Sequence, residues 1–237
     1  MEIGEIGEKA EIGKKIMSAR EDILNAVTQA TTARGARSVD AVAAHIAKRA
    51  SNVIPARGGA GSKGDKISRE TFIDEALKAG AYIEQSADME SVPGLVSEFL
   101  KSINIPGILR LSTDPGMAEI PWQDEPLLTV NTGPAEASDP VGVGIAQAGV
   151  AETGTVLMAS SPERPAMVNM VPLINIVLLP ESRLFGNYEQ SLDLIRENMP
   201  RLASYITGPS RTADIELELL MGAHGPQELL IILIEDM

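Results

Sequence analysis

The chain has 237 residues, of which 44% are hydrophobic and 22% are charged, as in an ordinary globular protein. Its 33 acidic residues outnumber its 20 Lys and Arg residues, and the resulting net charge of −13 repels phosphate backbones and argues against nucleic-acid binding. The absence of cysteine excludes disulfides, a catalytic thiol and cysteine-bound iron–sulfur clusters in this chain.

The first fifty residues predict two helices ahead of a glycine-rich linker. Aliphatic residues recur at helical spacing in both segments: Ile12, Ile16, Ile23 and Val27, then Val39, Val42 and Ile46. Residues 52–66 contain four glycines and a proline, which is typical of a flexible linker. A phosphate-binding loop requires Gly-Lys-Ser/Thr after a strand, whereas the order here is Ser62-Lys63-Gly64. We therefore expect a helical arm with its linker over residues 1–66 and an α/β domain over residues 67–237.

From Ser68 onward the pattern alternates between helices and strands. Ser68 is a candidate N-cap for a helix that ends at Gly80 and buries Phe72, Ile73, Ala76 and Leu77. A second helix is expected over residues 91–103, with Pro93 tolerated in its first turn. Short β-prone runs predict strands at residues 81–84, 107–111 and 127–130.

The second half of the chain continues the alternation. Residues 141–147 and 153–159 are interpreted as neighbouring strands joined by a turn at residues 149–152. The continuous apolar run 175–179 is typical of a strand covered on both faces, and a helix is expected over residues 187–198. Strands at residues 205–207 and 229–234 complete the sheet. Strands that alternate with helices predict a mainly parallel, Rossmann-like α/β sheet.

Membrane insertion and secretion are not expected. The longest strictly apolar run, residues 229–234, is far shorter than the roughly 20 residues that a membrane helix requires. The N-terminus carries acidic residues and scattered glycines instead of a signal-peptide pattern. We expect a cytoplasmic protein without a membrane span.

The first candidate site is the polar edge formed by Glu152, Thr153, Gly154 and Thr155, next to an apolar strand. Ligands of open α/β sheets collect at strand ends, where loops offer free N–H groups. A carboxylate at this position can be a general base, a nucleophile or a metal ligand. The alternative is a structural residue that satisfies N–H groups of its own loop, which is common for loop carboxylates.

The second candidate site follows a Gly-Pro turn and comprises Ser210, Arg211, Thr212 and Asp214. Its hydroxyls and guanidinium could hold a carboxylate or phosphate, or Ser210 or Thr212 could simply cap a helix. His224 is included as a candidate substrate contact, although a lone histidine in a turn is more often structural. No second His or Cys stands at metal-ligand spacing, so no metal is expected. The methionines, including Met158, Met167 and Met170, are interpreted as core residues.

Four segments together resemble the LUD-domain family in its stand-alone, lactate-utilisation protein C form: GVAETGTVLMAS, VPLINIVLLPES, YITGPSRTADIE and MGAHGPQELLIIL. The resemblance is strong over residues 141–233 and looser over residues 68–130. It implies a fold of the ribose-phosphate isomerase and CoA-transferase-like group. It also implies a role in oxidising L-lactate to pyruvate beside two iron–sulfur partner proteins, which would carry the clusters, so no cofactor is expected in this chain.

Three functions remain open at this point. The leading hypothesis is an accessory subunit of an iron–sulfur complex that oxidises L-lactate, contributing substrate binding, assembly or regulation. The second is a free-standing enzyme acting on a small acid or acyl-CoA, with Glu152 as the attacking carboxylate. The third is a pure interaction module without a ligand. Whether the chain is itself an enzyme is left open, because kinship of fold does not transmit mechanism.

Overall fold

The computed structural model describes residues 21–29, 40, 44, 66–213, 219–221 and 225–235. It divides into two units, Met1–Ile54 and Pro55–Met237. In the first unit residues 21–29 are helical, as predicted, and the side chains of Ile23 and Leu24 are exposed. Of the linker expected at residues 52–66, residues 52–65 lie outside the described residues and Lys66 is the first residue of a helix, so the domain boundary after residue 66 stays a prediction. None of the described helices has the length and apolar character that crossing a membrane requires.

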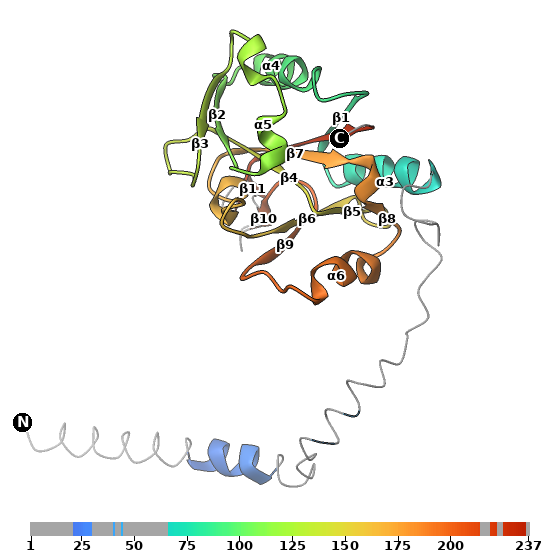
Figure 1. Ribbon diagram of the computed structural model, residues 1–237. Helices are drawn as coiled ribbons and strands as arrows, with labels where there is room; N and C mark the ends of the chain where they lie inside the picture. Colours follow the sequence, from blue (N-terminus) through green and yellow to red (C-terminus); the bar gives the residue numbers. More distant parts are fainter. Residues whose placement is uncertain are drawn as a thin grey trace, which may run out of the picture. The chain divides into compact units, whose positions relative to one another are not determined.

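The second unit is organised around a six-stranded sheet in the order β1-β12-β7-β4-β2-β3 (Figure 1). All five strand pairs are parallel, which confirms the expected α/β class. The strands are β1 (Tyr82–Ser86), β2 (Ile108–Leu111), β3 (Thr129–Thr132), β4 (Val141–Ile145), β7 (Ile174–Pro180) and β12 (Glu228–Ile234).

The continuous apolar runs of β7 and β12 are explained by cover on both faces of the sheet. Leu230, Ile232 and Ile234 of β12 pack in one cluster of buried side chains, and Leu229, Ile231 and Leu233 pack in another on the opposite face. Because successive strand residues point to opposite faces, a strand covered on both sides needs apolar residues at every position. The prediction of a buried central strand at residues 229–234 is confirmed.

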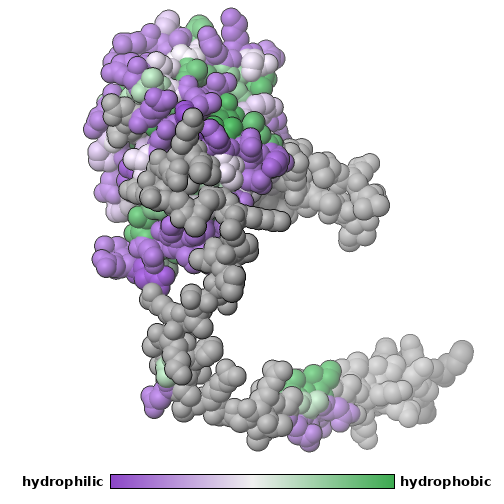
Figure 2. Space-filling view, turned by 90° about the vertical axis from the view of Figure 1, so that its right-hand side faces the viewer, coloured by the Kyte–Doolittle hydropathy of each residue, from purple (hydrophilic) through white to green (hydrophobic). Residues whose placement is uncertain are grey.

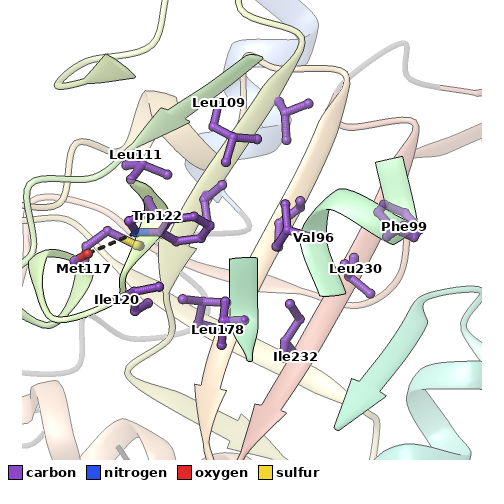
Figure 3. Packing of buried hydrophobic residues seen from close by; sticks show 14 of the residues in the cluster. Val96, Phe99, Leu109, Leu111, Met117, Ile120, Trp122, Leu178, Leu230 and Ile232 are labelled. Atoms are coloured by element: carbon purple, nitrogen blue, oxygen red, sulfur yellow. Dashed lines mark hydrogen bonds between the residues drawn. The ribbon is translucent and has the colours of Figure 1, made fainter. Parts of the chain in front are cut away.

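The first face is covered by α4 (Val92–Ser102), α5 (Pro115–Ala118) and η1 (Trp122–Asp124). Figure 3 shows Val96 and Phe99 of α4 beside the sheet residues Leu178, Leu230 and Ile232, in the same cluster as Trp122. Trp122 is buried, and its Nε1–H donates to the carbonyl oxygen of Met117 at 3.1 Å. That bond satisfies the single polar group that the indole ring brings into the core.

The opposite face is covered by α3 (Lys66–Lys78) and by a second sheet in the order β8-β5-β6-β9. The strands of this small sheet are β5 (Ala148–Val150), β6 (Thr155–Ala159), β8 (Leu184–Phe185) and β9 (Ala203–Ile206). Val156 and Met158 face the large sheet, whereas Leu157 faces α6 (Tyr188–Arg196) through Ile195. Figure 1 shows the resulting layers, with α6 farthest from α4. Figure 2 shows one face of this unit, where hydrophilic side chains predominate over small hydrophobic patches.

The small sheet contradicts the expected pairing of residues 141–147 with residues 153–159. β4 lies in the six-stranded sheet, whereas β6 pairs antiparallel with β5 and β9 in the small one. The turn before β6 ends at Gly154, whose φ of 62° closes a tight β5–β6 hairpin. A short turn of this kind joins only antiparallel strands, so it cannot extend a parallel sheet. The expectation that residues 205–207 complete the main sheet is wrong for the same reason, since β9 pairs with β6.

Several local predictions also need correction. α3 begins at Lys66, so Ser68 lies inside the helix and does not cap it. Leu77 faces solvent at 52% exposure instead of joining the core. Met158 is buried, but Met167, which lies within η2 (Ala166–Asn169), and Met170, which follows it, are both exposed. Elsewhere α4, β2, β7 and α6 lie within a few residues of the predicted boundaries.

Candidate functional site

The order of the strands marks one position in the large sheet as a binding crevice. β2 and β4 are neighbours, but the chain leaves β2 toward β3 and leaves β4 toward β7, on the other side. In open α/β sheets such a switch point leaves a crevice outside the carboxyl ends of the two strands. Ser112 follows β2 directly, and Gln147 follows β4 after one residue. The residues between and above these two positions form the candidate site.

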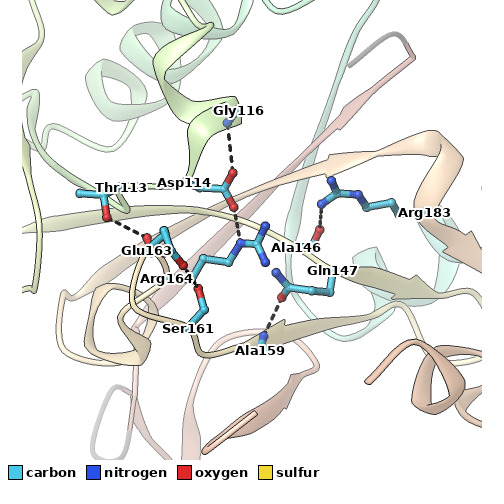
Figure 4. Close-up of polar contacts among 10 residues, drawn as sticks. All are labelled: Thr113, Asp114, Gly116, Ala146, Gln147, Ala159, Ser161, Glu163, Arg164 and Arg183. Atoms are coloured by element: carbon cyan, nitrogen blue, oxygen red, sulfur yellow. Dashed lines mark hydrogen bonds and ion pairs between the residues drawn. The ribbon is translucent and has the colours of Figure 1, made fainter. Parts of the chain in front are cut away.

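One wall of the site is an ion pair that joins two loops. Asp114 follows β2 and caps α5 by accepting a hydrogen bond from the Gly116 N–H at 3.1 Å. Its second carboxylate oxygen accepts from Nε of Arg164, which lies in the loop after β6 (Figure 4). Asp114 is 6% exposed and the Arg164 side chain about a third exposed. Arg164 uses only Nε for this pair, so its terminal nitrogens have no hydrogen-bond partner among the described residues.

The loop that carries Arg164 is held by two further bonds. The Thr113 hydroxyl donates to the carbonyl oxygen of Glu163 at 3.1 Å, which ties the loop to the end of β2. The Ser161 hydroxyl donates to the Glu163 carboxylate at 2.8 Å and holds the pKa of that exposed carboxyl below its usual range. These contacts restrict the position from which Arg164 extends.

The opposite wall contains Gln147 and Arg183. Oε1 of Gln147 accepts from the Ala159 N–H at 2.6 Å, which orients the amide so that its nitrogen points toward Arg164 (Figure 4). Arg183, just after β7, donates from Nη1 to the carbonyl oxygen of Ala146 at 2.7 Å. Burial, together with the nearby charge of Arg164, lowers the pKa of Arg183 below its usual value. The site therefore gathers two guanidinium groups against one buried carboxylate, Asp114.

Between the walls lies a small hollow lined by unpartnered polar atoms. Ser112 Oγ, Asn169 Oδ1 and Gln147 Nε2 are buried and have no hydrogen-bond partner in the part of the chain that is described. The hollow has a volume of about 10 Å³, which is the space of one water molecule. A Cβ at Gly144 would lie 2.6 Å from Asn169 Oδ1, so this strand position must be glycine for Asn169 to reach the sheet.

A wider cleft of about 750 Å³ opens on the outer side of Gln147 and Arg164. Its walls are the loop after β6, from Ala159 to Arg164, and the segment at the end of α6, from Leu194 to Arg201. Gln147, Ala159, Ser160 and Arg164 line both the hollow and the cleft. The hollow thus lies behind these side chains, and the cleft gives solvent access to them.

Comparison with known proteins now adds sequence kinship to this geometry. Residues 135–234, which include β4 through β12, match the LUD domain. This part of the chain, fewer than half of its 237 residues, is similar to the LUD domain. This confirms the resemblance inferred from the four sequence segments. The family region contains four of the site residues described above: Gln147, Arg164, Asn169 and Arg183.

Several curated relatives resemble the chain over part of its length. An uncharacterized protein of Neisseria meningitidis is 40% identical over 92 residues, which are 38% of this chain and 40% of the relative. Lactate utilization protein C of Bacillus subtilis is 37% identical over 102 residues, or 40% of this chain and 42% of the relative. Lactate utilization protein C of Anoxybacillus flavithermus is 33% identical over 104 residues, covering 43% and 47%. The similarity spans less than half of each of these relatives.

A solved structure supports the fold. A DUF162 family protein from Deinococcus radiodurans superposes with a TM-score of 0.50 and 17% sequence identity. The superposition covers 70% of this chain and 95% of the other. At this level of identity the similarity shows a common fold and no more.

In this LUD domain the first predicted site, residues 152–155, forms a network of hydroxyl groups. Thr155 is fully buried, and its Oγ1 lies 2.7 Å from Thr153 Oγ1, 3.0 Å from the Tyr188 hydroxyl and 2.6 Å from Thr207 Oγ1. Gly154 is buried against α3, where a Cβ would lie 2.1 Å from the backbone nitrogen of Ala76. These groups satisfy one another, and α3 covers the edge that was expected to be open.

Glu152 also has a local partner. Its Oε1 accepts from the backbone N–H of Tyr188, the first residue of α6, at 3.3 Å. A carboxylate at a helix N-terminus is stabilised by the free N–H groups and by the helix dipole. This contact favours the structural interpretation of Glu152 over the catalytic one.

The second predicted site is described only in part. Ser210 donates its backbone N–H to the carbonyl oxygen of Pro226 at 2.8 Å, and Arg211 and Thr212 lie in strand β10 (Arg211–Ala213), paired with β11 (Leu219–Met221). The alternative interpretation of this segment as a capped helix start is therefore wrong, because residues 211–213 form a strand. The side chains of Arg211 and Thr212, and all of Asp214 and His224, lie outside the described residues, so their role in binding stays a prediction.

The sequence did not indicate Arg164 or Arg183 as site residues. Both stand in proline-containing segments, SSPERP and LLPESR, where a charged residue is usually read as solvated. The available signal was the position of Arg183 just after the buried parallel strand β7, since the carboxyl ends of such strands meet at one edge. Among the described residues no group of three or more His, Cys, Asp or Glu is placed to hold a metal ion.

Proposed function

We propose that this chain works in lactate utilisation as an accessory subunit beside iron–sulfur partner proteins. The observation that carries the proposal is the similarity of its family region to proteins named lactate utilization protein C in several bacteria. The same region supplies Gln147, Arg164, Asn169 and Arg183 to the switch-point site. Sequence kinship and the most developed polar site therefore coincide in one part of the chain.

The composition suggests how the work is divided. Oxidation of lactate to pyruvate removes two electrons, which need an acceptor such as a flavin or iron–sulfur cluster. This chain has no cysteine with which to hold a cluster. In the proposed assembly the iron–sulfur clusters of the partners accept the electrons. This chain contributes a binding site for a small acid and a surface that binds the partners.

Deletion of the gene in the organism that encodes it tests the role in lactate utilisation. The deletion strain should grow normally on glucose and poorly on L-lactate as the carbon source, and the wild-type gene should restore growth on L-lactate. Normal growth of the deletion strain on L-lactate would contradict the proposal. A strain carrying a tagged copy of the chain tests the partner assignment, since the purified complex should show the visible absorption of iron–sulfur clusters.

A further inference from the structure

We propose that the cleft between the β6–η2 loop and the end of α6 binds a small organic monocarboxylate, held by Arg164 and Gln147. The proposed function enters only in the choice of L-lactate and pyruvate as the first ligands to test. The site is new with respect to the residues that the sequence indicated, none of which lies in it.

The free polar groups at the inner end of the cleft are hydrogen-bond donors. Arg164 has unpartnered terminal nitrogens beside its Nε bond to Asp114. Gln147 Nε2 is buried and unpartnered between the hollow and the cleft, and it points toward Arg164 (Figure 4). Ser160 Oγ accepts from the Leu202 N–H at 3.0 Å, which leaves its own hydrogen free to donate. Three donors without an acceptor call for a ligand that only accepts. A carboxylate does so, and the fork of a guanidinium matches its two oxygens.

The charge of the cleft has the opposite sign from that of the chain. Two arginines, Arg164 and Arg201, line the cleft. No Asp or Glu is among the described residues that line it. Two acidic residues lie near Arg164 but do not line the cleft. Asp114 forms the ion pair with Arg164, and the Glu163 carboxylate accepts a hydrogen bond from the Ser161 hydroxyl. In a chain of net charge −13, a cleft lined by two arginines and by no described Asp or Glu favours anions more than the average charge of the chain does.

The dimensions place the ligand in the cleft and not in the hollow. The hollow of about 10 Å³ holds a water molecule, which can bond to Ser112 Oγ and Asn169 Oδ1. The cleft of about 750 Å³ is within the range of small-molecule sites. Leu194 and Met199 supply an apolar wall for the alkyl part of an organic acid. Asp114 acts as a positioning residue, because its bond to Nε directs the terminal nitrogens of Arg164 away from it and toward Gln147.

Isothermal titration calorimetry of the full chain, at constant ionic strength, tests the proposal with L-lactate, pyruvate, acetate and inorganic phosphate. Gln147→Glu is the central variant. The new carboxylate keeps an oxygen that accepts from the Ala159 N–H. Its second oxygen replaces the amide nitrogen of Gln147 and can form an ion pair with Arg164, in place of the ligand. Arg164→Gln removes the clamp, and Arg196→Gln is the matched control, since Arg196 pairs with Asp193 on the exposed side of α6 and does not line the cleft.

We expect the wild-type chain and Arg196→Gln to bind at least one of the carboxylates with equal affinity. Both cleft variants should bind that ligand about 10- to 100-fold more weakly, as is typical for loss of a charged hydrogen bond. If Arg164→Gln does not fold because Asp114 is left unpaired, Gln147→Glu alone decides the matter. Absence of carboxylate binding by the wild type, equal binding by Gln147→Glu, or tighter binding of phosphate than of every carboxylate would overturn the proposal.

The growth test and the binding test fail independently. Loss of growth on L-lactate without carboxylate binding would leave the proposed function in place and remove this site. The opposite outcome is that the purified chain binds a carboxylate in a manner that depends on Gln147, but the deletion strain grows normally on L-lactate. That outcome would support the site and contradict the proposed function.

Discussion

Replacement of Thr155 by Val tests whether residues 152–155 form a structural network or a ligand site. Thr155 is fully buried in β6, and its hydroxyl contacts Thr153, Tyr188 and Thr207 at 2.6 to 3.0 Å. Valine has nearly the same shape, so the change removes the hydroxyl without opening a cavity. It leaves up to three hydroxyl groups without their shared partner.

The size of the effect follows from what each partner can do afterwards. Thr207 is exposed and can turn to water, so its loss is small. Thr153 and Tyr188 keep their mutual bond at 3.1 Å but lose the bonds to Thr155. Two net bonds of about 1 kcal/mol each, partly offset by the added methyl group, give a loss of about 1.5 kcal/mol. In a unit of this size that corresponds to a fall in Tm of about 3–6 °C.

Urea unfolding followed by circular dichroism, together with calorimetric melting, measures this loss. Thr129→Val is the control, because Thr129 is exposed on β3 and should change the free energy of unfolding by less than about 0.5 kcal/mol. A Thr155→Val variant as stable as the wild type would refute the network interpretation. Wild-type stability combined with failure to restore growth on L-lactate would instead establish the ligand role that the sequence indicated.

The other predictions concern the sheet and one ion pair. Ile232→Asp places an unpaired carboxylate in the fully buried centre of β12 and should abolish cooperative unfolding; a melting curve like that of the parent would contradict the sheet order. Gly154→Ala forces a side chain into a backbone at φ 62° and within 2.1 Å of the Ala76 nitrogen, so the free energy of unfolding should fall by more than about 2 kcal/mol. Hydrogen bonds from Arg110 hold the pKa of buried Asp139 below its ordinary 3.8 in the folded state. The stability that this pair contributes is therefore complete above pH 3.8 and is lost as the pH falls through the lowered pKa of the folded state. Asp139→Asn should make the free energy of unfolding in urea less dependent on pH between about 2.5 and about 5.

The large sheet was predictable because its central strands carry their pattern in consecutive residues. A run such as LLIILI is typical of a strand covered on both faces, and β7 has the same character. The small sheet had no such signal. β5 is only three residues long, Ala148–Val150, and is rich in small side chains, so the sequence pattern predicts a turn at residues 149–152 instead of a strand.

The site was less predictable because its contacts are distant in sequence. Polar residues beside a strand were recognised in residues 152–155, but the sequence does not show that Thr155 bonds to Tyr188 and Thr207. The partner of Arg164 lies fifty positions earlier, at Asp114. Charge and spacing identify neither member of such a pair, because the pairing is set by the order of strands in the folded sheet.

The place of β12 in the sheet has a consequence for synthesis of the chain. β12 is the last of the six strands in sequence, yet it lies between β1 and β7 and is the strand with which β1 pairs. During translation β1 therefore emerges more than a hundred residues before its partner. Until residues 228–234 leave the ribosome, β1 and β7 each expose an unpaired strand edge, which is the kind of surface that aggregates. In the growing chain these two edges can pair with their common neighbour in the sheet only after β12 has been made.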